Sequence, residues 1–276
     1  MTTASMRQRP QLLGDDARRF WALTWTLAAT DWKLRYYGSF LGYVWTLVRP
    51  FAFFGVIYVV FTEIANVGAG IPHYGVYILF SMVLFQFFAE ATTACVTSLV
   101  NRENLLRKMR FPRLVIPLST VLTALLNLGM TLCAVFIFAI GNGVYPDWSW
   151  LELPVLIVLL AALATGTGML LSALYVRYRD VQPVWDVASQ ILFYASPVLY
   201  VATMVPEDYR QAYMLNPIAS VLTQVRHAVI DPGAPSAADV AGGAEWLLIP
   251  FAIVVLAVAL GTWVFSREAP RIAENL

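Results

Sequence analysis

Few residues in this chain combine the type and the spacing that catalytic chemistry requires. Lys33 and Lys108 are the only lysines and neither follows a glycine, so the Gly-Lys pair of an ATP-binding loop does not occur. The sequence has no HExxH zinc motif, no nucleophile elbow and no paired Cys or His ligands. Cys95 and Cys133 both fall in apolar stretches, where packing as small hydrophobic side chains is expected rather than a disulfide or a metal site. The residues therefore offer no case for an enzyme.

Two isolated ionisable residues stay open as functional candidates. Glu90 lies inside an apolar stretch of membrane-spanning length, so it is either a functional acid or a carboxyl group that is hydrogen-bonded within the protein. His227 is either a proton carrier or a solvated side chain, and the only other histidine, His73, is distant in sequence.

The elements that must position these residues are long apolar stretches. Each is long enough, at about 1.5 Å per helical residue, to cross a hydrocarbon core of about 30 Å. The six stretches are Leu41–Thr62, Tyr74–Val100, Leu114–Ile140, Leu151–Val176, Val184–Met204 and Trp246–Phe265. The chain of 276 residues is 59% hydrophobic and 13% charged, whereas soluble proteins carry roughly 25% charged residues. This composition excludes an ordinary soluble enzyme and predicts an all-α polytopic membrane protein with six transmembrane helices.

The basic residues give the orientation. They cluster before the first stretch and after the second, fourth and sixth, and the loops after the first and third contain no Lys or Arg. Because basic residues are retained on the cytoplasmic side, both termini are expected there. No signal peptide is expected, because the first apolar stretch starts only at Leu41. The predicted division is a cytoplasmic segment 1–40, a membrane domain 41–267 and a cytoplasmic tail 268–276.

The N-terminal segment contains an amphipathic helix, and the first span contains a charge. Trp21, Trp25 and Trp32 share one stripe of a helix over Ala17–Tyr36, with Lys33 and Arg35 near its end. Tryptophans on a basic amphipathic helix favour the membrane interface, and a soluble helix packed on a partner protein is the alternative. In the first span, Arg49 should reach toward the inner surface or a wet space, and Pro50 should kink or break the helix.

Two further segments are predicted to be short helices outside the regular spans. The basic segment Asn101–Arg113 reads as a short cytoplasmic helix that Phe111-Pro112 ends, although it could be a loop that only sets the topology. On the outer side, Asn216-Pro217 is a good helix start that follows a short helix around Glu207–Leu215. We expect a helical hairpin within 205–231 that dips in from outside, with a surface helix as the alternative.

The two faces of the second hairpin helix differ. Its apolar face should pack on the bundle, and its polar face, Ser220, Gln224 and His227, should meet water or sugar. In the fourth span, Ala164, Gly168 and Ser172 are spaced by four, which predicts a small-residue face for close helix contact, and Gly166 is expected to serve packing too.

Four motifs in order resemble those of one known family. They are Lys33-Leu-Arg35-Tyr36 with Trp45 and Pro50, Arg107-Lys-Met-Arg-Phe-Pro-Arg113 with Pro117-Leu-Ser119, Leu171-Ser-Ala-Leu-Tyr-Val-Arg-Tyr-Arg-Asp-Val181, and Pro197 with Pro206 and Asn216-Pro217. Together, from about Trp21 to Phe265, they resemble permeases of type-2 ABC exporters for polysaccharides, with O-antigen and teichoic-acid exporters as the nearest kin. Met109 and Arg110 depart from the pattern of that family, where an aromatic or β-branched residue is common.

The resemblance implies partners and a substrate in the bacterial cytoplasmic membrane. Two copies would pair and bind two ATPase subunits, which would hold ATP and Mg, so this chain would need no cofactor of its own. Nucleic acid is not expected as a partner. The substrate would be a polysaccharide linked to a polyprenyl diphosphate lipid. A permease for drugs or small lipids, and a passive channel or scaffold, are the alternatives.

The resemblance also implies roles for individual residues. Residues Trp21–Arg35 would form an interface helix in contact with membrane lipid, and the segment around Asn216, Pro217, Gln224 and His227 would form an outer gate. The residues that would contact the ATPase are Asn101, Arg102, Glu103, Arg107, Lys108, Arg110, Phe111, Arg113, Arg177, Arg179 and Asp180.

Aromatic side chains in two spans are candidates for a sugar path, because aromatic faces can stack on the C–H surfaces of sugar rings. The alternative for each is ordinary packing in the bundle or against lipid. The candidates for the channel lining are Phe51, Phe54, Tyr58, Phe193, Tyr194 and Tyr200, together with Glu90.

Overall fold

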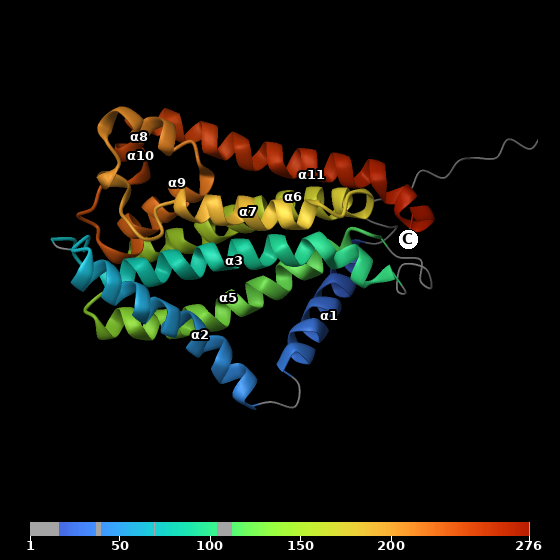
Figure 1. The fold of residues 1–276 in the computed structure, drawn as a ribbon, viewed down its shortest axis with the longest axis horizontal. Helices are drawn as coiled ribbons and strands as arrows, with labels where there is room; N and C mark the ends of the chain where they lie inside the picture. Colours follow the sequence, from blue (N-terminus) through green and yellow to red (C-terminus); the bar gives the residue numbers. More distant parts are fainter. Residues whose placement is uncertain (1–16, 37–39, 69, 104–111, 276) are drawn as a thin grey trace, which may run out of the picture.

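The computed structural model describes residues 17–36, 40–68, 70–103 and 112–275, and every regular element in these ranges is a helix. The long helices run nearly side by side, and shorter helices gather at one end (Figure 1). In order, the elements are α1 (Ala17–Tyr36), α2 (Phe40–Val59), η1 (Val60–Ile64), α3 (Tyr74–Asn101), α5 (Val115–Gly141), η2 (Trp148–Leu151), α6 (Glu152–Arg177), α7 (Val181–Tyr194), η3 (Ala202–Met204), α8 (Glu207–Tyr213), α9 (Pro217–Val225), η4 (Arg226–Ile230), α10 (Ala237–Ala241), η5 (Ala244–Leu247) and α11 (Leu248–Asn275).

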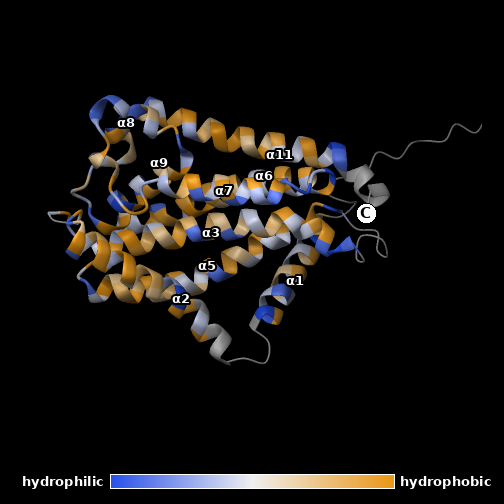
Figure 2. Cartoon of the chain, viewed as in Figure 1, coloured by the Kyte–Doolittle hydropathy of each residue, from blue (hydrophilic) through white to orange (hydrophobic). Residues whose placement is uncertain are grey.

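Helix α3 is the centre of the bundle. It packs against α5 on one side and α6 on the other, and α6 in turn packs against α11 (Figure 1). In the most apolar stretch of α3, 72% of the residues are buried within the protein. In the span Leu47–Ile64 the corresponding share is 6%. Apolar residues follow the long helices, and hydrophilic residues gather at the two ends of the bundle, as expected for a protein that crosses a membrane (Figure 2).

Five helical segments of the described chain are long and apolar enough to cross a membrane. They are Leu47–Ile64, Tyr74–Asn101, Val115–Gly141, Trp148–Arg177 and Ala244–Glu268. Each matches one of the six expected apolar stretches, and the stretch that is left over is the fifth.

The expectation of one continuous helix across the fifth stretch is wrong. Helix α7 begins at Val181 and ends at Tyr194, and the buried residues Ser196 to Leu199 follow in turns. Pro197 explains the early end, because proline has no N–H for the helical ladder and biases the preceding residue away from helical geometry. A helix of 14 residues is about 21 Å long, too short to cross a bilayer by itself.

In α2, by contrast, the expected proline break does not occur. The helix runs from Phe40 through Pro50 to Val59 and continues as the π-helical turn Val60–Ile64. Helices α1 and α2 form a V at the edge of the bundle, with the open side of the V toward α5 (Figure 1).

The small-residue face of α6 gives close helix contacts, as expected. Ala164, Gly168 and Ser172 are buried, and a Cβ built on Gly168 would lie 2.8 Å from Sγ of Cys95 on α3. Cys95 is fully buried and packs as a small apolar residue, whereas Cys133 is exposed on the isolated chain.

Candidate functional site

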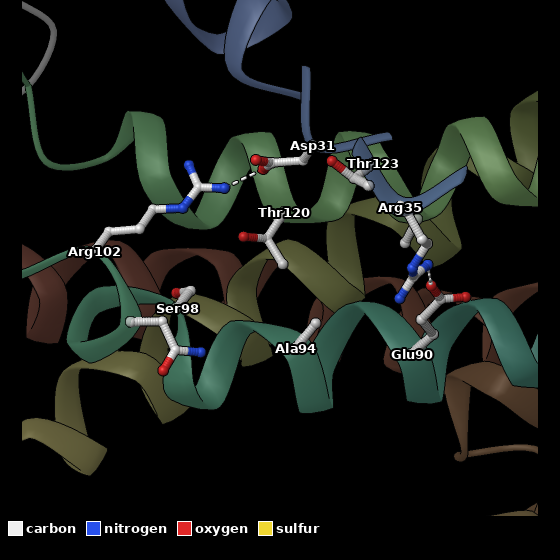
Figure 3. A pocket seen from close by; sticks show the side chains of 10 residues that line it. Asp31, Arg35, Glu90, Ala94, Ser98, Arg102, Thr120 and Thr123 are labelled. Atoms are coloured by element: carbon white, nitrogen blue, oxygen red, sulfur yellow. Dashed lines mark hydrogen bonds and ion pairs between the residues drawn. The ribbon is translucent and has the colours of Figure 1, made fainter. Parts of the chain in front are cut away.

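Polar side chains line a cavity of about 290 Å³ between α1, α3 and α5. An ion pair lies at each end: Arg102 binds Asp31, and Arg35 binds Glu90 (Figure 3). Thr120 of α5 lies between the two pairs (Figure 3). The cavity is lined by Asp31, Arg35, Glu90, Ala94, Ser98, Asn101, Arg102, Thr120, Thr123 and Ala124.

The intramembrane acid Glu90 is held by two partners. Besides the guanidinium of Arg35, its Oε1 atom accepts a hydrogen bond of 2.7 Å from Nδ2 of Asn127 on α5. Because a carboxylate within an apolar span is costly without partners, this arrangement accounts for its presence. The structure thus places Glu90 on the α1 side of α3, where it is hydrogen-bonded within the protein.

Helix α1 packs on α5 through small residues. Thr24 and Ala28 are fully buried, and the hydroxyl of Thr123 donates a hydrogen bond of 3.3 Å to the carbonyl of Ala28. Trp21 and Trp25 point away from the bundle, with exposed fractions of 61% and 55%. This exposure suits the predicted interface helix, whose position in a membrane stays a prediction.

The residues expected to contact an ATPase divide into three groups. Asn101 is the last residue of α3, Arg102 turns inward to Asp31, and Glu103 and Arg113 are half-buried. Desolvation lowers the pKa of Arg113. Arg107, Lys108, Arg110 and Phe111 lie outside the described residues. The third group, Arg177, Arg179 and Asp180, is exposed on the turn between α6 and α7.

That turn is held by its own aromatic residues. The guanidinium of Arg179 lies 4.9 Å from the ring centroid of Tyr175, and that of Arg177 lies 5.3 Å from the centroid of Tyr178. Such cation–π contacts leave the outer edges of both guanidinium groups available for a partner.

The expected channel aromatics occupy two separate places. On α2, Phe54 is buried and packs with Tyr58 and with Phe138 of α5, which Phe51 also contacts. Near the end of α7, Phe193 packs edge-on against Phe85 and Tyr194, and the hydroxyl of Tyr200 donates to the carbonyl of Tyr194. Tyr194 and Tyr58 are exposed on this chain, whereas Glu90 lies apart from both groups.

Two short helices form where the outer hairpin was expected. Asn216 caps α9 as predicted, because its Oδ1 accepts a hydrogen bond of 3.0 Å from the amide of Ile218, and Pro217 is the first helical residue. The Nδ2 group of Asn216 also donates to Oγ of Ser196 at 3.0 Å. One side chain therefore joins the start of α9 to the turn that follows α7.

The expectation that the polar face, Ser220, Gln224 and His227, meets water is wrong for Ser220, whereas Gln224 and His227 are half-buried and their contact with water or sugar stays a prediction. Ser220 is buried and donates to the carbonyl of Met214, and Gln224 binds Glu152 at 2.7 Å and the amide of Ala237 at 3.1 Å. His227 contacts the carbonyl of Ala234 through Nδ1 at 2.7 Å. The chain after η4 folds back to form α10 and partly covers this face, where Ala234 and Ala237 supply partners for His227 and Gln224.

Tyrosines and one buried arginine make further contacts within and next to the hairpin of α8 and α9. The hydroxyl of Tyr213 donates to that of Tyr200 at 3.0 Å, and burial together with this contact raises the pKa of Tyr213. Arg226, only 9% exposed, faces Asp231 at 3.8 Å and lies over the ring of Tyr77. At the surface, Ser236 caps α10, and its hydrogen bonds lower the pKa of Asp239. Tyr213 therefore stays neutral and Asp239 charged at neutral pH.

A model of the ABC-2 type transporter matches residues 22–230. This range includes every residue that lines the cavity and both helices of the outer hairpin. The chain belongs to the ABC-2 type transporter family.

Similar members of known name are permeases for polysaccharides. The O-antigen export system permease protein RfbA of Klebsiella pneumoniae is 27% identical over 247 residues, which cover 89% of this chain and 92% of the relative. RfbA of Myxococcus xanthus is 26% identical over 253 residues, 91% of this chain and 94% of the relative. The polysialic acid transport protein KpsM of Escherichia coli is 23% identical over 239 residues, 84% and 89% of the two chains.

Three residues of this ABC-2 permease that form polar contacts between or beyond helices were not predicted as site residues from the sequence. Asp31 had a signal, because it lies one helical turn before Arg35, on the same face. Asn127 and Arg226 had no such signal in the sequence. The partner of Asn127 is Glu90 on another helix, and the partner of Arg226 is Asp231, beyond the end of its own helix.

Replacing Asn216 with alanine is expected to lower the free energy of unfolding of the permease by about 1 kcal/mol. The change removes the cap of α9 and the hydrogen bond to Ser196. A difference of this size leaves the bundle inserted but is enough to shift any conformational equilibrium whose states differ by a few kcal/mol. The measurement is the thermal midpoint of the purified protein together with leakage of a small ion from proteoliposomes. The exposed Gln211 of α8 is the control, and equal behaviour of Asn216→Ala and Gln211→Ala would contradict the role of the cap.

Proposed function

We propose that this chain is the membrane subunit of an ABC exporter that moves a cell-envelope polysaccharide across the cytoplasmic membrane. The observation that carries the proposal is the similarity to O-antigen permeases over about nine-tenths of both chains, joined to the family match. A transporter for a long glycan suits a chain of membrane-spanning helices that has no ATP-binding loop of its own.

Energy comes from a pair of separate ATPase subunits that bind ATP and Mg. Their contact surface on this chain comprises the segment Asn101–Arg113 and the turn Arg177–Asp180. The exposure of Arg177 and Arg179 supports the second contact, because arginine pairs bidentately with carboxylates on a partner. The density of basic residues in 101–113 supports the first.

A second copy of the chain completes the pore. Helix α7 presents Val184, Val187, Ile191 and Tyr194 outward on one face, with exposed fractions of 59% to 66%. The non-helical backbone that follows α7 is already shielded within this chain, where the hydroxyl of Tyr74 donates to the carbonyl of Leu199 at 2.7 Å. Packing of a partner copy against α7 and the largely unburied α2 would instead cover their exposed apolar faces.

The exported glycan is linked to a polyprenyl diphosphate lipid and passes between the two copies. The exposed Tyr58 and Tyr194 support a path along α2 and α7, because aromatic rings can stack on sugar without strong sequence demand. The outer hairpin, α8 and α9, lies at the end of the bundle opposite the C-terminal end of α11 and acts as the gate (Figure 1).

The direct test is removal of the gene from its host and complementation with the intact chain. We expect loss of the surface polysaccharide and accumulation of its lipid-linked form on the cytoplasmic side of the membrane. Mass spectrometry of the purified complex should identify a co-bound lipid-linked sugar. Unchanged surface polysaccharide together with altered efflux of drugs would instead indicate the alternative class of ABC permease.

The six-crossing topology gives a separate expected result. In a variant without Cys95 and Cys133, cysteines at Asp147 and at Asp239 should react with an impermeant maleimide in intact cells, because both acids lie in outer segments. A cysteine at Glu274 should react only after the cells are opened. Reaction of Glu274→Cys in intact cells would mean that α7 and the turns after it do not complete a crossing.

A further inference from the structure

Two ion pairs of opposite sense tie α1 to the centre of the bundle. On α1 the acid comes first, Asp31, and the base follows one turn later, Arg35. On the α3 side the order of charges along the chain is the same, Glu90 and then Arg102. Because Asp31 pairs with Arg102 and Arg35 with Glu90, the two segments run in opposite directions, and each charge of α1 meets its opposite. The contacts join residues 71 and 55 positions apart in sequence.

The spacing of the two pairs explains the cavity between them. Asp31 and Arg35 are separated by about 6 Å along α1, whereas the twelve positions from Glu90 to Arg102 correspond to about 18 Å along α3. The long side chain of Arg102 closes this difference by extending along α3 toward Asp31, whereas Arg35 reaches across to Glu90 (Figure 3). The space left between them is lined by small and hydroxyl-bearing residues, Ala94, Ser98, Thr120 and Thr123, so the pairs have room to rearrange.

Arg102 lies at the junction between α3 and the segment that is proposed to contact the ATPase. It is the residue directly after α3, at the start of the segment proposed to contact the ATPase. Its guanidinium is turned inward, with 19% of the side chain exposed, and it also reaches the hydroxyl of Ser119 at 3.5 Å. A displacement of the segment would therefore pull on Asp31 and, through it, on α1.

Asp31 has a second possible partner on its own helix. Residues four apart on a helix are neighbours, so Arg35 can turn from Glu90 to Asp31 when Arg102 withdraws. Glu90 would then keep the hydrogen bond from Asn127. The two ion pairs would accordingly form and break together.

We propose that Asp31, Arg35, Glu90 and Arg102 form a linkage that transmits movement of the segment 101–113 to α1. These four are positioning residues, which act on the transport path through α1 and touch neither nucleotide nor glycan. The proposal rests on the proposed function, because it requires an ATPase that moves this segment.

The test is made with the permease–ATPase complex in proteoliposomes and in the deletion host, with glycan export and ATP hydrolysis measured side by side. Asp31→Asn and Arg102→Gln should each lower the glycan exported per ATP hydrolysed by about fivefold or more, the lower range of ordinary coupling between sites. Arg35→Gln should act alike, and combining it with Asp31→Asn should add little, because both changes break one linkage.

Charge exchange separates a linkage from a merely structural role. The double variant Asp31→Arg with Arg102→Asp should recover most of the export per ATP, as should Arg35→Glu with Glu90→Arg. The controls are Arg19→Gln, an exposed base on α1, and Glu63→Gln, an exposed acid on η1, which should behave as wild type.

Three results would overturn the proposal: wild-type coupling in all single variants, single variants that the charge exchanges do not rescue, or fully additive effects. If Asp31→Asn does not accumulate in the membrane, the double variant Asp31→Arg with Arg102→Asp is the deciding test. Its failure to restore accumulation and export would count against the linkage. Failure of the proposed function is distinguishable, because the wild-type complex would then export no glycan at all.

Discussion

Replacing Gly261 with alanine is expected to lower the free energy of unfolding of the permease by about 3 kcal/mol, the upper part of the range for overpacking. A Cβ at Gly261 would collide with the carbonyl group of Gly166 on α6. Conversely, a Cβ on Gly166 would lie 2.5 Å from the backbone of Ala257 and Val258 on α11. Because backbone atoms rather than flexible side chains are in the way, the two helices must move apart to admit even one methyl group.

The control for this substitution is Gly129→Ala in α5. A Cβ at Gly129 would meet no atom within 4 Å, so alanine should raise the stability by about 0.5–1 kcal/mol through its better helix propensity. Both variants are measured by unfolding the purified protein with SDS in mixed micelles. Equal stability of Gly261→Ala and the wild type would show that α6 and α11 are not packed at backbone contact.

Replacing Asp231 with asparagine is expected to destabilise the outer hairpin by about 2 kcal/mol. The change keeps the side-chain oxygen that accepts from the amide of Gly233 at 3.1 Å but removes the charge that faces Arg226. Arg226 is buried, so its guanidinium would remain away from water without an acid to compensate it. The long N–O separation of 3.8 Å keeps the expected effect below that of a tight buried pair.

Combining Asp231→Asn with Arg226→Met tests whether the loss of stability comes from the uncompensated charge of Arg226. Methionine fills a similar volume without a charge, so the double variant should recover most of the lost stability, and it should keep a packing contact with Tyr77. The exposed Asp208 of α8 supplies the control variant Asp208→Asn. Limited proteolysis of the outer segments and the thermal midpoint are the two measurements. A double variant less stable than Asp231→Asn would show that the arginine stabilises the hairpin by other contacts.

The contacts behind these two predictions could be predicted from the sequence only in part. The role of Gly166 in packing could be inferred from its place in an apolar span, but its partner, Gly261, could not. Asp231 and Arg226 are close in sequence, yet only the fold shows that the arginine is buried and lies over the ring of Tyr77. A glycine or a charge in the sequence thus indicates a special position without giving what lies opposite.

Hydropathy and motifs were enough to predict the long spanning helices and the family. Apolar stretches of sufficient length must satisfy their backbone polar groups internally, so α3, α5, α6 and α11 form where hydropathy places them. The start of α9 at Asn216-Pro217 was also predictable, because capping is a local hydrogen bond within three residues. The ordered motifs resembled the ABC-2 permeases to which the chain belongs.

Only the tertiary structure decided how these helices use their polar residues. Hydropathy alone did not show that α7 ends at Tyr194, because the residues that follow are equally apolar, although Pro197 is a local signal for that end. It could not show that the returning chain contacts Gln224 through Ala237, nor that Arg35 and Arg102 pair with Glu90 and Asp31. Local propensity and hydropathy depend on neighbours in sequence, whereas an ion pair between helices depends on the angle and depth at which α1 meets the bundle. That angle is set by the packing of Thr24 and Ala28 against α5, and it is the packing that brings the opposite charges together.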